Sequence, residues 1–341
     1  MKFRSVLITG GAGFIGSNYV RYALHHHPEW RVVVLDKLTY AGNLENLADV
    51  LHRIEFHHGD IADPKAVRRA MAGVEAVLNF AAESHVDRSL LDPRPFVRTN
   101  VEGTLVLLEE ARRAGVCRFL QVSTDEVYGD LSPTDRWAKE EDPLRPRSPY
   151  AASKAAAEHF VLAYGESHGL EAVITRGSNT YGPYQYPEKI IPLFVTNALE
   201  NKPLPVYGNG SAVRDYLHVE DHCAGIDLIL HQGKAGRAYN LGARLQVSGL
   251  EVAQRILEIL GKPESLIRFV PDRPGHDYRY AIDPSEAEAL GWQRRWSFED
   301  GLRQTVAWYA NNQGWWRRLK ETPQFWALER QVYSQGWRRE P

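Results

Sequence analysis

A tyrosine and a lysine stand four residues apart in the segment Tyr150-Ala151-Ala152-Ser153-Lys154. On a helix this spacing places Tyr150 and Lys154 on the same face. A free tyrosine, with a pKa of about 10, is a poor base at neutral pH. A neighbouring ammonium group favours the phenolate and so makes proton transfer possible. The pair could therefore take a proton from a hydroxyl group, although the same spacing is also common on protein surfaces.

A hydroxyl and two acids follow a predicted strand, because Arg118–Ser123 runs into Thr124-Asp125-Glu126. Ligands of open α/β sheets bind at the carboxyl ends of the strands. Adjacent side chains of an extended segment point opposite ways, so a turn is needed to bring both acids to one site. Such a site would hold a general acid beside a general base. The alternative is a solvated turn that caps a helix.

A glycine-rich turn lies near the start of the chain, where Val6-Leu7-Ile8-Thr9 precedes Gly10-Gly11-Ala12-Gly13-Phe14-Ile15-Gly16. The pattern is a strand, a turn and then a helix. Gly10 permits a tight turn, Gly13 lets the backbone approach a pyrophosphate, and Gly16 permits close helix–strand packing. The free N–H groups of the helix then face the phosphates.

An acid follows this turn at the spacing expected for a dinucleotide site. Asp36 comes 20 residues after Gly16, at the end of the second predicted strand. A carboxylate there accepts hydrogen bonds from ribose hydroxyls and repels a 2′-phosphate, so NAD is favoured over NADP. Lys37 weakens that preference slightly. The alternative is a glycine turn that binds no ligand.

Short apolar runs alternate with helix-length segments through the first half of the chain, which predicts an α/β fold. Helices are predicted over Val101–Ala114 and Tyr150–His168, ending at Gly115 and Gly169. This alternation indicates a Rossmann-type, doubly wound parallel sheet with helices on both faces. The predicted strands are Val6–Thr9, Arg31–Leu35, Ile54–His57, Val74–Phe80, Arg118–Ser123, Ala172–Arg176 and, returning later, Arg237–Leu241.

A smaller, mixed lobe is expected in the second half, interwoven with the first. Residues 1–179, with about 216–242 returning to the sheet, form the predicted dinucleotide-binding domain. Residues 180–215 and 243–341 form the predicted substrate-binding lobe. Seven of the nine tryptophans lie after residue 290. We expect them to pack this lobe rather than line a pocket, in particular Trp315, Trp316, Trp326 and Trp337.

Composition excludes several classes of protein. The 341 residues carry a net charge of -2, which argues against non-specific nucleic-acid or membrane-surface binding. Two cysteines provide no disulfide framework, and the chain has no long apolar run, so we expect a cytoplasmic protein. The run His25-His26-His27 has no acidic or cysteine partner at ligand spacing, so a solvated helix end is expected and no metal site is predicted.

Taken together, these motifs resemble the extended short-chain dehydrogenase/reductases and, within them, the dTDP-glucose 4,6-dehydratases. The resemblance covers nearly the whole chain, and the Thr-Asp-Glu triplet is its most discriminating part, since related epimerases usually lack the acidic pair. The segments that carry it are Thr9–Gly16, Asp36–Asn43, Ala81–Asp87, Thr124–Gly129, Tyr150–Lys154, Asn179–Tyr184, Arg214–Tyr216 and Asp272–Asp277.

The resemblance implies an internal redox cycle on dTDP-glucose. Tyr150 would take the proton of the C4 hydroxyl while hydride moves to NAD, Thr124 would hold that hydroxyl, and Lys154 would tune Tyr150. Glu126 would then remove the C5 proton as base, and Asp125 would protonate the C6 oxygen so that water leaves. Hydride would return to C6, giving a 4-keto-6-deoxy sugar nucleotide with NAD recycled. The two carboxyl groups must then hold different protonation states.

The resemblance also assigns contacts. Gly249 departs from it, because these dehydratases often carry Asn there. Contacts to NAD are implied for Gly10, Gly13, Phe14, Ile15, Gly16, Asp36, Lys37, Leu38, Thr39, Asp60, Ile61, Phe80, Ala81, Ala82, Ser84, Thr99, Tyr150, Lys154 and Thr180. Contacts to the sugar nucleotide are implied for Ser84, Thr124, Asn179, Lys189, Pro205, Tyr207, Arg214, Arg273 and His276; the two arginines suit the diphosphate.

Two further expectations follow, and two alternatives stay open. The family pairs the helices corresponding to Val101–Ala114 and Tyr150–His168 across a two-fold axis, which implies a homodimer. A different nucleotide-sugar 4,6-dehydratase or a 4-epimerase would share this fold. A non-catalytic NAD-binding sensor would not need the five residues Thr124, Asp125, Glu126, Tyr150 and Lys154.

Overall fold

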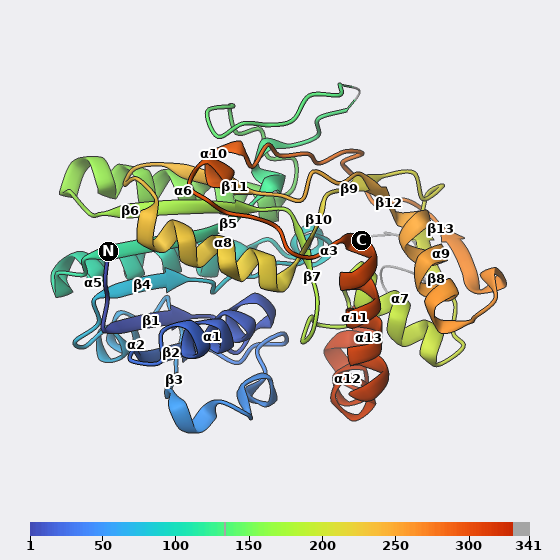
Figure 1. Ribbon diagram of the computed structural model, residues 1–341, viewed down its shortest axis with the longest axis horizontal. Coiled ribbons are helices and arrows are strands. Elements are labelled where there is room, and N and C mark those ends of the chain that lie inside the picture. The colour runs from blue at the N-terminus through green and yellow to red at the C-terminus, as the bar shows by residue number, and fades with distance from the viewer. Residues whose placement is uncertain (133, 330–341) are drawn as a thin grey trace.

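Seven parallel strands form the central sheet of the computed structural model, which describes residues 1–132 and 134–329. Their spatial order is β11-β6-β5-β4-β1-β2-β3, so the sheet is doubly wound as predicted (Figure 1). The predicted return of the chain to the sheet is also confirmed, since β11 pairs with β6. The strands are β1 (Ser5–Thr9), β2 (Arg31–Asp36), β3 (Glu55–His58), β4 (Ala76–Asn79), β5 (Arg118–Thr124), β6 (Ala172–Gly177) and β11 (Ala238–Leu241).

Helices cover both faces of this sheet. Because successive strand residues point to opposite faces, Val6 and Ile8 of β1 face one layer while Leu7 faces the other. The layer on the Val6 side contains α1 (Phe14–His26) and α8 (Val219–Gln232), which pack against each other. The opposite layer contains α2 (Pro64–Ala70), α5 (Thr104–Ala114) and α6 (Pro149–His168).

The two helices that follow β4 and precede β6 end as predicted. Gly115 and Gly169 close α5 and α6 with φ values of 69° and 67°, a left-handed conformation that favours glycine. The predicted start of the first helix at Val101 is wrong. A π-helical segment, η3 (Val97–Gly103), continues directly into α5, and it is preceded by α3 (Val86–Leu91) and α4 (Arg94–Phe96).

A second lobe lies beside the carboxyl ends of the strands (Figure 1). It has its own apolar core, built around Phe194, Ile256 and Trp316. Its division from the sheet at the residue boundaries expected above stays a prediction. The remaining elements are β7 (Asn179–Tyr181), α7 (Ile190–Leu199), β8 (Leu204–Tyr207), β9 (Val213–Arg214), β10 (Tyr216–His218), β12 (Val247–Ser248), α9 (Gly249–Leu260), β13 (Ile267–Val270), α10 (Ser285–Ala289), α11 (Phe298–Asn311), α12 (Gln313–Lys320) and α13 (Pro323–Glu329).

The late tryptophans divide into two groups. Trp315 and Trp316 are buried in the core of the second lobe, as predicted. Trp326 is 46% exposed, so the prediction that it packs the lobe is wrong. It lies on α13. Trp337 lies outside the described residues.

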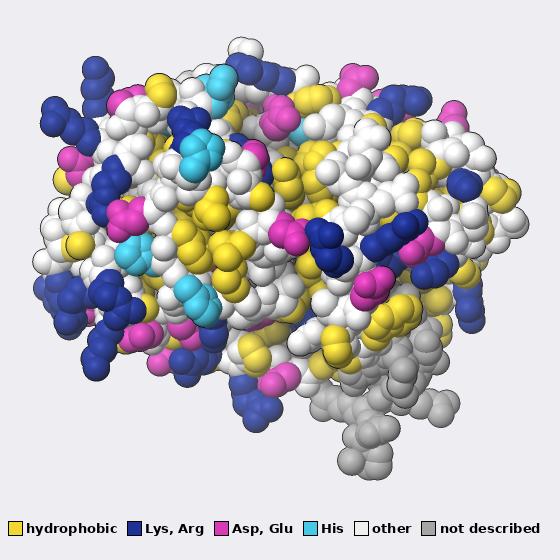
Figure 2. Space-filling view, turned by 90° about the horizontal axis from the view of Figure 1, so that it is seen from below, with side chains coloured by type: hydrophobic (Ala, Val, Ile, Leu, Met, Phe, Trp, Pro, Cys, Tyr) yellow, Lys and Arg dark blue, Asp and Glu magenta, His cyan; other side chains and the backbone are white. Residues whose placement is uncertain are grey.

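Basic and acidic side chains are interspersed over the face that Figure 2 shows. This mixture agrees with the small net charge of the chain. Within the part of the chain that the structure describes, no helix has both the length and the apolar character needed to cross a membrane. The expected cytoplasmic location stays a prediction.

Candidate active site

The glycine turn is built so tightly that side chains cannot replace its glycines. Gly10 has a φ of +68°, and a Cβ there would meet the backbone nitrogen of Ala81 at 2.6 Å. A Cβ on Gly16 would overlap the carbonyl oxygen of Gly10. The Gly13 N–H donates to that same carbonyl at 3.1 Å. The turn therefore brings bare backbone and the start of α1 to the edge of a cleft, as the motif predicts.

Asp36 braces this turn from the end of β2. Its Oδ2 accepts a hydrogen bond from the Ala12 N–H at 2.9 Å, and its Oδ1 accepts one from the Leu38 N–H at 2.8 Å. Burial raises the pKa of Asp36, while these backbone hydrogen bonds oppose the rise. Each carboxylate oxygen can accept a second hydrogen bond. The carboxylate can thus hold the loop and still receive ribose hydroxyls.

A cleft runs from the glycine turn along the carboxyl ends of the strands, and it brings together most residues expected to bind the cofactor. Leu38 and Thr180 are the exceptions, since neither lines the cleft. Thr180 instead lies 2.8 Å from the Nδ1 atom of His222. The expected residues that line the cleft are Gly10, Gly13, Phe14, Ile15, Gly16, Asp36, Lys37, Thr39, Asp60, Ile61, Phe80, Ala81, Ala82, Ser84, Thr99, Tyr150 and Lys154.

The residues present fit a dinucleotide. The glycine turn exposes backbone N–H groups beside the N-terminus of α1, where phosphates bind in other proteins. The Asp36 carboxylate lies at the place where this class of site meets a ribose. Lys37 pairs with Asp60 at 2.8 Å on the rim, so its charge is already matched. Lys37 therefore does not overturn the preference for an unphosphorylated ribose.

Tyr150 and Lys154 both point into the far end of this cleft from α6, as their spacing predicts. Burial and the nearby Glu126 raise the pKa of Tyr150, although a hydrogen bond with Thr124 opposes the rise. The ammonium of Lys154 donates to the Val122 carbonyl at 2.6 Å, and burial lowers its pKa to about 8. The expected lowering of the Tyr150 pKa by Lys154 is therefore not found in the protein alone.

The acidic pair lies on the turn that the sequence required. Thr124 caps a short 3-10 helix, η4 (Asp125–Tyr128), accepting the Glu126 N–H at 3.3 Å. Its hydroxyl donates to Asp125 Oδ1 at 3.2 Å. The Asp125 Oδ2 and the Glu126 Oε2 are buried with no hydrogen-bond partner among the described residues. Each acid thus keeps one oxygen that no group of the described residues occupies. Glu126 lines the second cavity described below, whereas Asp125 lines neither that cavity nor the cofactor cleft.

Environment separates the two acids. Burial, then the charge of Glu126, raises the pKa of Asp125 well above its ordinary value. Burial also raises the pKa of Glu126, but Arg273, Lys189 and Arg214 lower it in turn. Asp125 therefore holds its proton more firmly than Glu126. This difference suits Asp125 to donate a proton and Glu126 to accept one.

A second cavity opens on the other side of Glu126, between the sheet and the second lobe. Glu188 and Lys189 line both cavities, so the two spaces meet there. Ser84 belongs to the first cleft, and Thr124 lines neither cavity but lies beside Tyr150. The expected substrate residues that line the second cavity are Asn179, Lys189, Pro205, Tyr207, Arg214, Arg273 and His276.

Cations in this cavity are held by partners that leave them facing it. Arg273 pairs with Asp87 at 3.0 Å, and the Tyr207 hydroxyl donates to the other oxygen of Asp87, also at 3.0 Å. Arg214 donates to the Nε2 atom of His276 at 3.0 Å. Burial, then Arg273 and Arg214, lowers the pKa of His276 to about 4, so the ring is neutral at neutral pH. The cavity suits an anion such as a diphosphate.

Several lining residues were missed by reasoning from the sequence. Asp87 orients Arg273, and its place at the end of the Ala81–Asp87 motif was the available signal. Glu188 pairs with Arg88 at 2.8 Å and gave no signal beyond its position next to Lys189. Gly249, noted above as a departure from the family pattern, does line the second cavity.

Comparison with known proteins agrees with this site. The family described as GDP-mannose 4,6 dehydratase matches residues 7–305. The low-salt glycan biosynthesis protein Agl12 of Haloferax volcanii is 52% identical over 89% of this chain and 98% of its own length. The dTDP-glucose 4,6-dehydratase of Streptomyces niveus is 49% identical over 92% of this chain and 95% of its own length.

A comparison with solved structures also finds a dTDP-glucose 4,6-dehydratase. The crystal structure of DesIV, a dTDP-glucose 4,6-dehydratase from Streptomyces venezuelae with NAD and TYD bound, superposes with a TM-score of 0.90. It is 50% identical and covers 93% of this chain and 100% of that one. The chain therefore belongs to the dTDP-glucose 4,6-dehydratase family of NAD-dependent nucleotide-sugar dehydratases.

Proposed function

We propose that this chain converts dTDP-glucose to dTDP-4-keto-6-deoxyglucose and water. The observation that carries the proposal is the place of the acidic pair. Glu126 lines the substrate cavity, Tyr150 and Lys154 line the cofactor cleft, and Asp125 and Thr124 lie buried between them. One sugar ring at this junction would have an acid, a base and a redox partner within reach.

The first chemical step in this proposal is at C4. Tyr150 accepts the proton of the C4 hydroxyl, which Thr124 holds in place through the hydroxyl that already bonds to Tyr150. NAD held by the cleft residues would supply a reversible hydride acceptor and a positive charge for this step. Lys154, anchored on the Val122 carbonyl, fixes the geometry of this end of the cleft. The product of the step is a 4-keto sugar, whose C5 proton is acidic.

The second step is elimination across C5 and C6. The Glu126 carboxylate accepts the C5 proton, and the electron pair of that C–H bond forms the double bond to C6. The C6–O bond breaks as Asp125 gives its proton to the departing hydroxyl, so that water leaves. The unequal pKa values of the two acids support this assignment. The hydride taken from C4 would then return from the cofactor to C6, and the same Glu126 would give the proton back to C5, which completes the product and regenerates NAD.

The nucleotide part of the substrate would be bound by the cationic side chains of the second cavity. We infer that Arg273 and Arg214 bind the diphosphate, since Arg214 is buried, the Arg273 side chain is only 16% exposed, and each guanidinium is held by a fixed partner. Asn179 and Lys189 then lie closer to the sugar, beside Glu126. The nucleoside extends toward Pro205 and Gly249, the remaining wall of the cavity.

We also infer a homodimer. Its support is three exposed apolar side chains, Leu91, Val97 and Phe160, which lie on α3, η3 and α6. Helix α6 contacts both α3 and η3. Light scattering at micromolar concentration should give the mass of two chains, and Val97→Asp should shift it toward one. A single-chain mass for the unchanged protein would contradict this inference.

Mass analysis of products tests the function directly. The protein is incubated separately with dTDP-glucose and with UDP-, GDP- and CDP-sugars. Loss of one water from dTDP-glucose, without net accumulation of reduced NAD, is the expected result. An unchanged product mass with altered stereochemistry would identify a 4-epimerase, and faster dehydration of another nucleotide sugar would reassign the substrate. A protein that converts none of them would be a binding protein, and the proposal would fail.

A further inference from the structure

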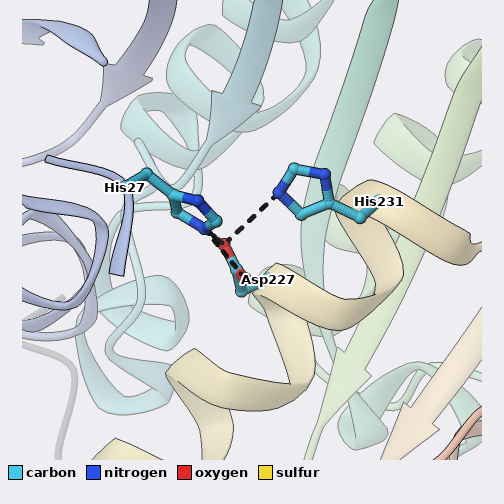
Figure 3. A group of neighbouring side chains, drawn as sticks. All are labelled: His27, Asp227 and His231. Carbon is cyan, nitrogen blue, oxygen red and sulfur yellow. Dashed lines mark hydrogen bonds and ion pairs between the residues drawn. The ribbon is translucent and has the colours of Figure 1, made fainter. Parts of the chain in front are cut away.

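The third histidine of the His25-His26-His27 run lies at the far end of α1 from the glycine turn. Among residues 1–132 and 134–329, one group of three His, Cys, Asp and Glu side chains has ligand atoms close enough to share an ion, and it comprises His27, Asp227 and His231. These atoms all lie within 4.8 Å of one another. Figure 3 shows His27 entering from the end of α1, while Asp227 and His231 project from successive turns of α8.

The distances between the possible ligand atoms are close to those between the ligand atoms of a bound metal ion. The His27 Nε2 atom lies 2.9 Å and 3.1 Å from the two Asp227 oxygens, and the His231 Nε2 atom lies 3.9 Å from Oδ1. Zinc binds imidazole nitrogen and carboxylate oxygen at about 2.0–2.2 Å, so tetrahedral ligand atoms stand roughly 3.3 Å apart. The observed spacings lie on both sides of that value.

One hydrogen bond fixes the proton on His231. Its Nδ1 atom lies 2.7 Å from the Met1 carbonyl oxygen, which can only accept, so Nδ1 carries the hydrogen. In the neutral ring Nε2 then has a free lone pair, and this buried atom has no hydrogen-bond partner among the described residues. A lone pair thus faces a carboxylate oxygen. The two atoms are 3.9 Å apart, a separation that a cation bound by both could span.

The surroundings resemble the outer shell of a metal site. Metal-binding histidines usually donate their second N–H to a carbonyl, as His231 does, and metal-binding carboxylates are themselves hydrogen-bonded. The buried Tyr19 hydroxyl donates to Asp227 Oδ1 at 3.0 Å.

Aromatic packing holds both rings in place. Trp30 stacks on His27 with ring centres 3.9 Å apart and planes 9° from parallel. Phe3 packs against His231 at 5.4 Å. The side chains of His27, Asp227 and His231 are still 19%, 13% and 19% exposed, so an ion could reach them from solvent.

We propose that His27, Asp227 and His231 bind one divalent transition-metal ion, with zinc as the best fit, and that this ion joins the C-terminal end of α1 to α8. Two imidazoles and one carboxylate favour zinc over magnesium or calcium, which prefer oxygen ligands. A water would complete the tetrahedron. Inspection of the histidine run found no acidic partner at ligand spacing, because Asp227 is supplied from 200 residues further along the chain.

The site acts on stability rather than on the dehydration reaction. None of its three side chains lines the cofactor cleft or the substrate cavity. The 13 residues of α1 separate it from Phe14 at the cleft by about 20 Å, at 1.5 Å per residue. Binding to the folded state alone raises the unfolding temperature by mass action.

Metal content and unfolding temperature test the proposal. The protein is stripped with a chelator, dialysed against Zn²⁺ and analysed by mass spectrometry of elements; Co²⁺ serves as a visible probe of coordination. His26→Gln is the matched control, because His26 stacks on Tyr22 and its Nδ1 lies 3.0 Å from the Tyr22 carbonyl. The original protein and the control should retain about one Zn²⁺ per chain and gain several degrees in unfolding temperature. His27→Gln and His231→Gln should lose both effects and the tetrahedral Co²⁺ absorption.

Three results would overturn the proposal. In the first, the original protein retains no more zinc than His27→Gln does. In the second, His26→Gln loses as much zinc as His27→Gln does. In the third, the unfolding temperature does not respond to Zn²⁺, which would mean that a proton, and no metal ion, lies between the three side chains. Asp227→Asn provides a further variant of unchanged shape should a histidine variant fail to fold. Dehydratase turnover should be equal in stripped and loaded protein, and a fall on stripping would contradict the assignment to stability.

Discussion

The cofactor cleft and the substrate cavity meet at Glu188 and Lys189 but are made in different ways. At its phosphate-binding end the cleft is formed by the backbone of one strand–turn–helix unit, Ser5–His26, which Asp36 braces. Its other walls come from later segments, which include Ala81, Thr99 and Tyr150. The cavity is formed by side chains from segments far apart in the chain. Its central pair, Asp87 and Arg273, is separated by 186 residues.

This difference affects what each region tolerates. In the cleft, space is limited by backbone atoms that cannot move independently of the sheet. In the cavity, burial raises the pKa of Glu126 and the charges of Arg273, Lys189 and Arg214 oppose that rise, so function there depends on charge more than on close contact. Changes of volume should harm the cleft, and changes of charge should harm the cavity.

The largest effects are expected where the two regions join. Tyr150→Phe, Asp125→Asn and Glu126→Gln should each lower turnover by about 10²–10⁴-fold, because each removes a positioned acid or base. Tyr150→Phe should block oxidation at C4, so no reduced-nicotinamide absorbance develops on rapid mixing with dTDP-glucose. The two acid variants should still develop that absorbance and then fail at elimination.

Solvent exchange separates the two acids further. In deuterated water, Glu126→Gln should lose exchange of the C5 hydrogen, whereas Asp125→Asn should keep it. Normal turnover by both acid variants would show that the two carboxyl groups have only a structural role. The junction of the cofactor cleft and the substrate cavity would then not be the place where the acid and the base act.

The next largest effect tests close contact in the cleft. Gly16→Ala places a methyl group against the Gly10 carbonyl, which is backbone and cannot rotate away. Overpacking of about 1–3 kcal/mol should weaken NAD binding roughly 10- to 100-fold, measured by calorimetric titration. Gly165→Ala is the control, because its Cβ would approach other atoms no closer than 3.5 Å. Equal NAD affinity in both variants would show that the turn has more freedom than its contacts indicate.

A smaller effect tests charge in the cavity. Arg273→Gln removes a positive charge that lowers the pKa of Glu126. Because the base acts when ionised, kcat/KM rises with pH through that pKa, and the acidic limb of the profile should move to higher pH. KM should also rise about 10-fold or more, since a charged hydrogen bond contributes about 1.5–3 kcal/mol. Arg268→Gln, at an exposed position outside both cavities, should leave both quantities unchanged.

The same contrast explains what could be predicted from the sequence. The strands of the sheet, the return of β11, the glycine turn and Asp36 were predicted from local patterns, because the turn, the helix start and Asp36 lie within one short segment. The other cleft residues came from resemblance to a family. The acids were predicted to need a turn, and η4 provides it. The errors were small. One helix begins as η3 at Val97 and not at Val101, and two residues expected in the cofactor cleft, Leu38 and Thr180, do not line it.

Long-range pairings could not be predicted in this way. The substrate residues came from resemblance to a family, and their partners, such as Asp87 for Arg273, have no local signal. The same holds for Asp227, which packs beside His27 only because α1 and α8 lie together on one face of the sheet. Trp326 shows a different limit of prediction, because its apolar residue type led us to expect burial and the side chain is exposed.

The smallest effect is expected at Gly249, which we compare with Gly16 of the glycine turn. Gly249 lines the substrate cavity at the start of α9, and a Cβ there would approach only Ile190 Cδ1 at 3.6 Å and the Gly210 carbonyl at 3.8 Å. These are ordinary contact distances, so a side chain fits where one at Gly16 does not. Gly249→Asn should leave the fold and NAD affinity unchanged while adding an amide that can hydrogen-bond a nucleotide base.

A single neutral hydrogen bond contributes about 0.5–1.5 kcal/mol, so the KM for dTDP-glucose should fall only a few-fold, with kcat unchanged. Steady-state kinetics against dTDP- and UDP-glucose measure the change, and Gly249→Ala controls for volume alone. A large loss of activity in Gly249→Ala would mean that this wall is as closely packed as the glycine turn. In that case the distinction drawn here between a cleft limited by backbone and a cavity governed by charge would not hold at the nucleotide end.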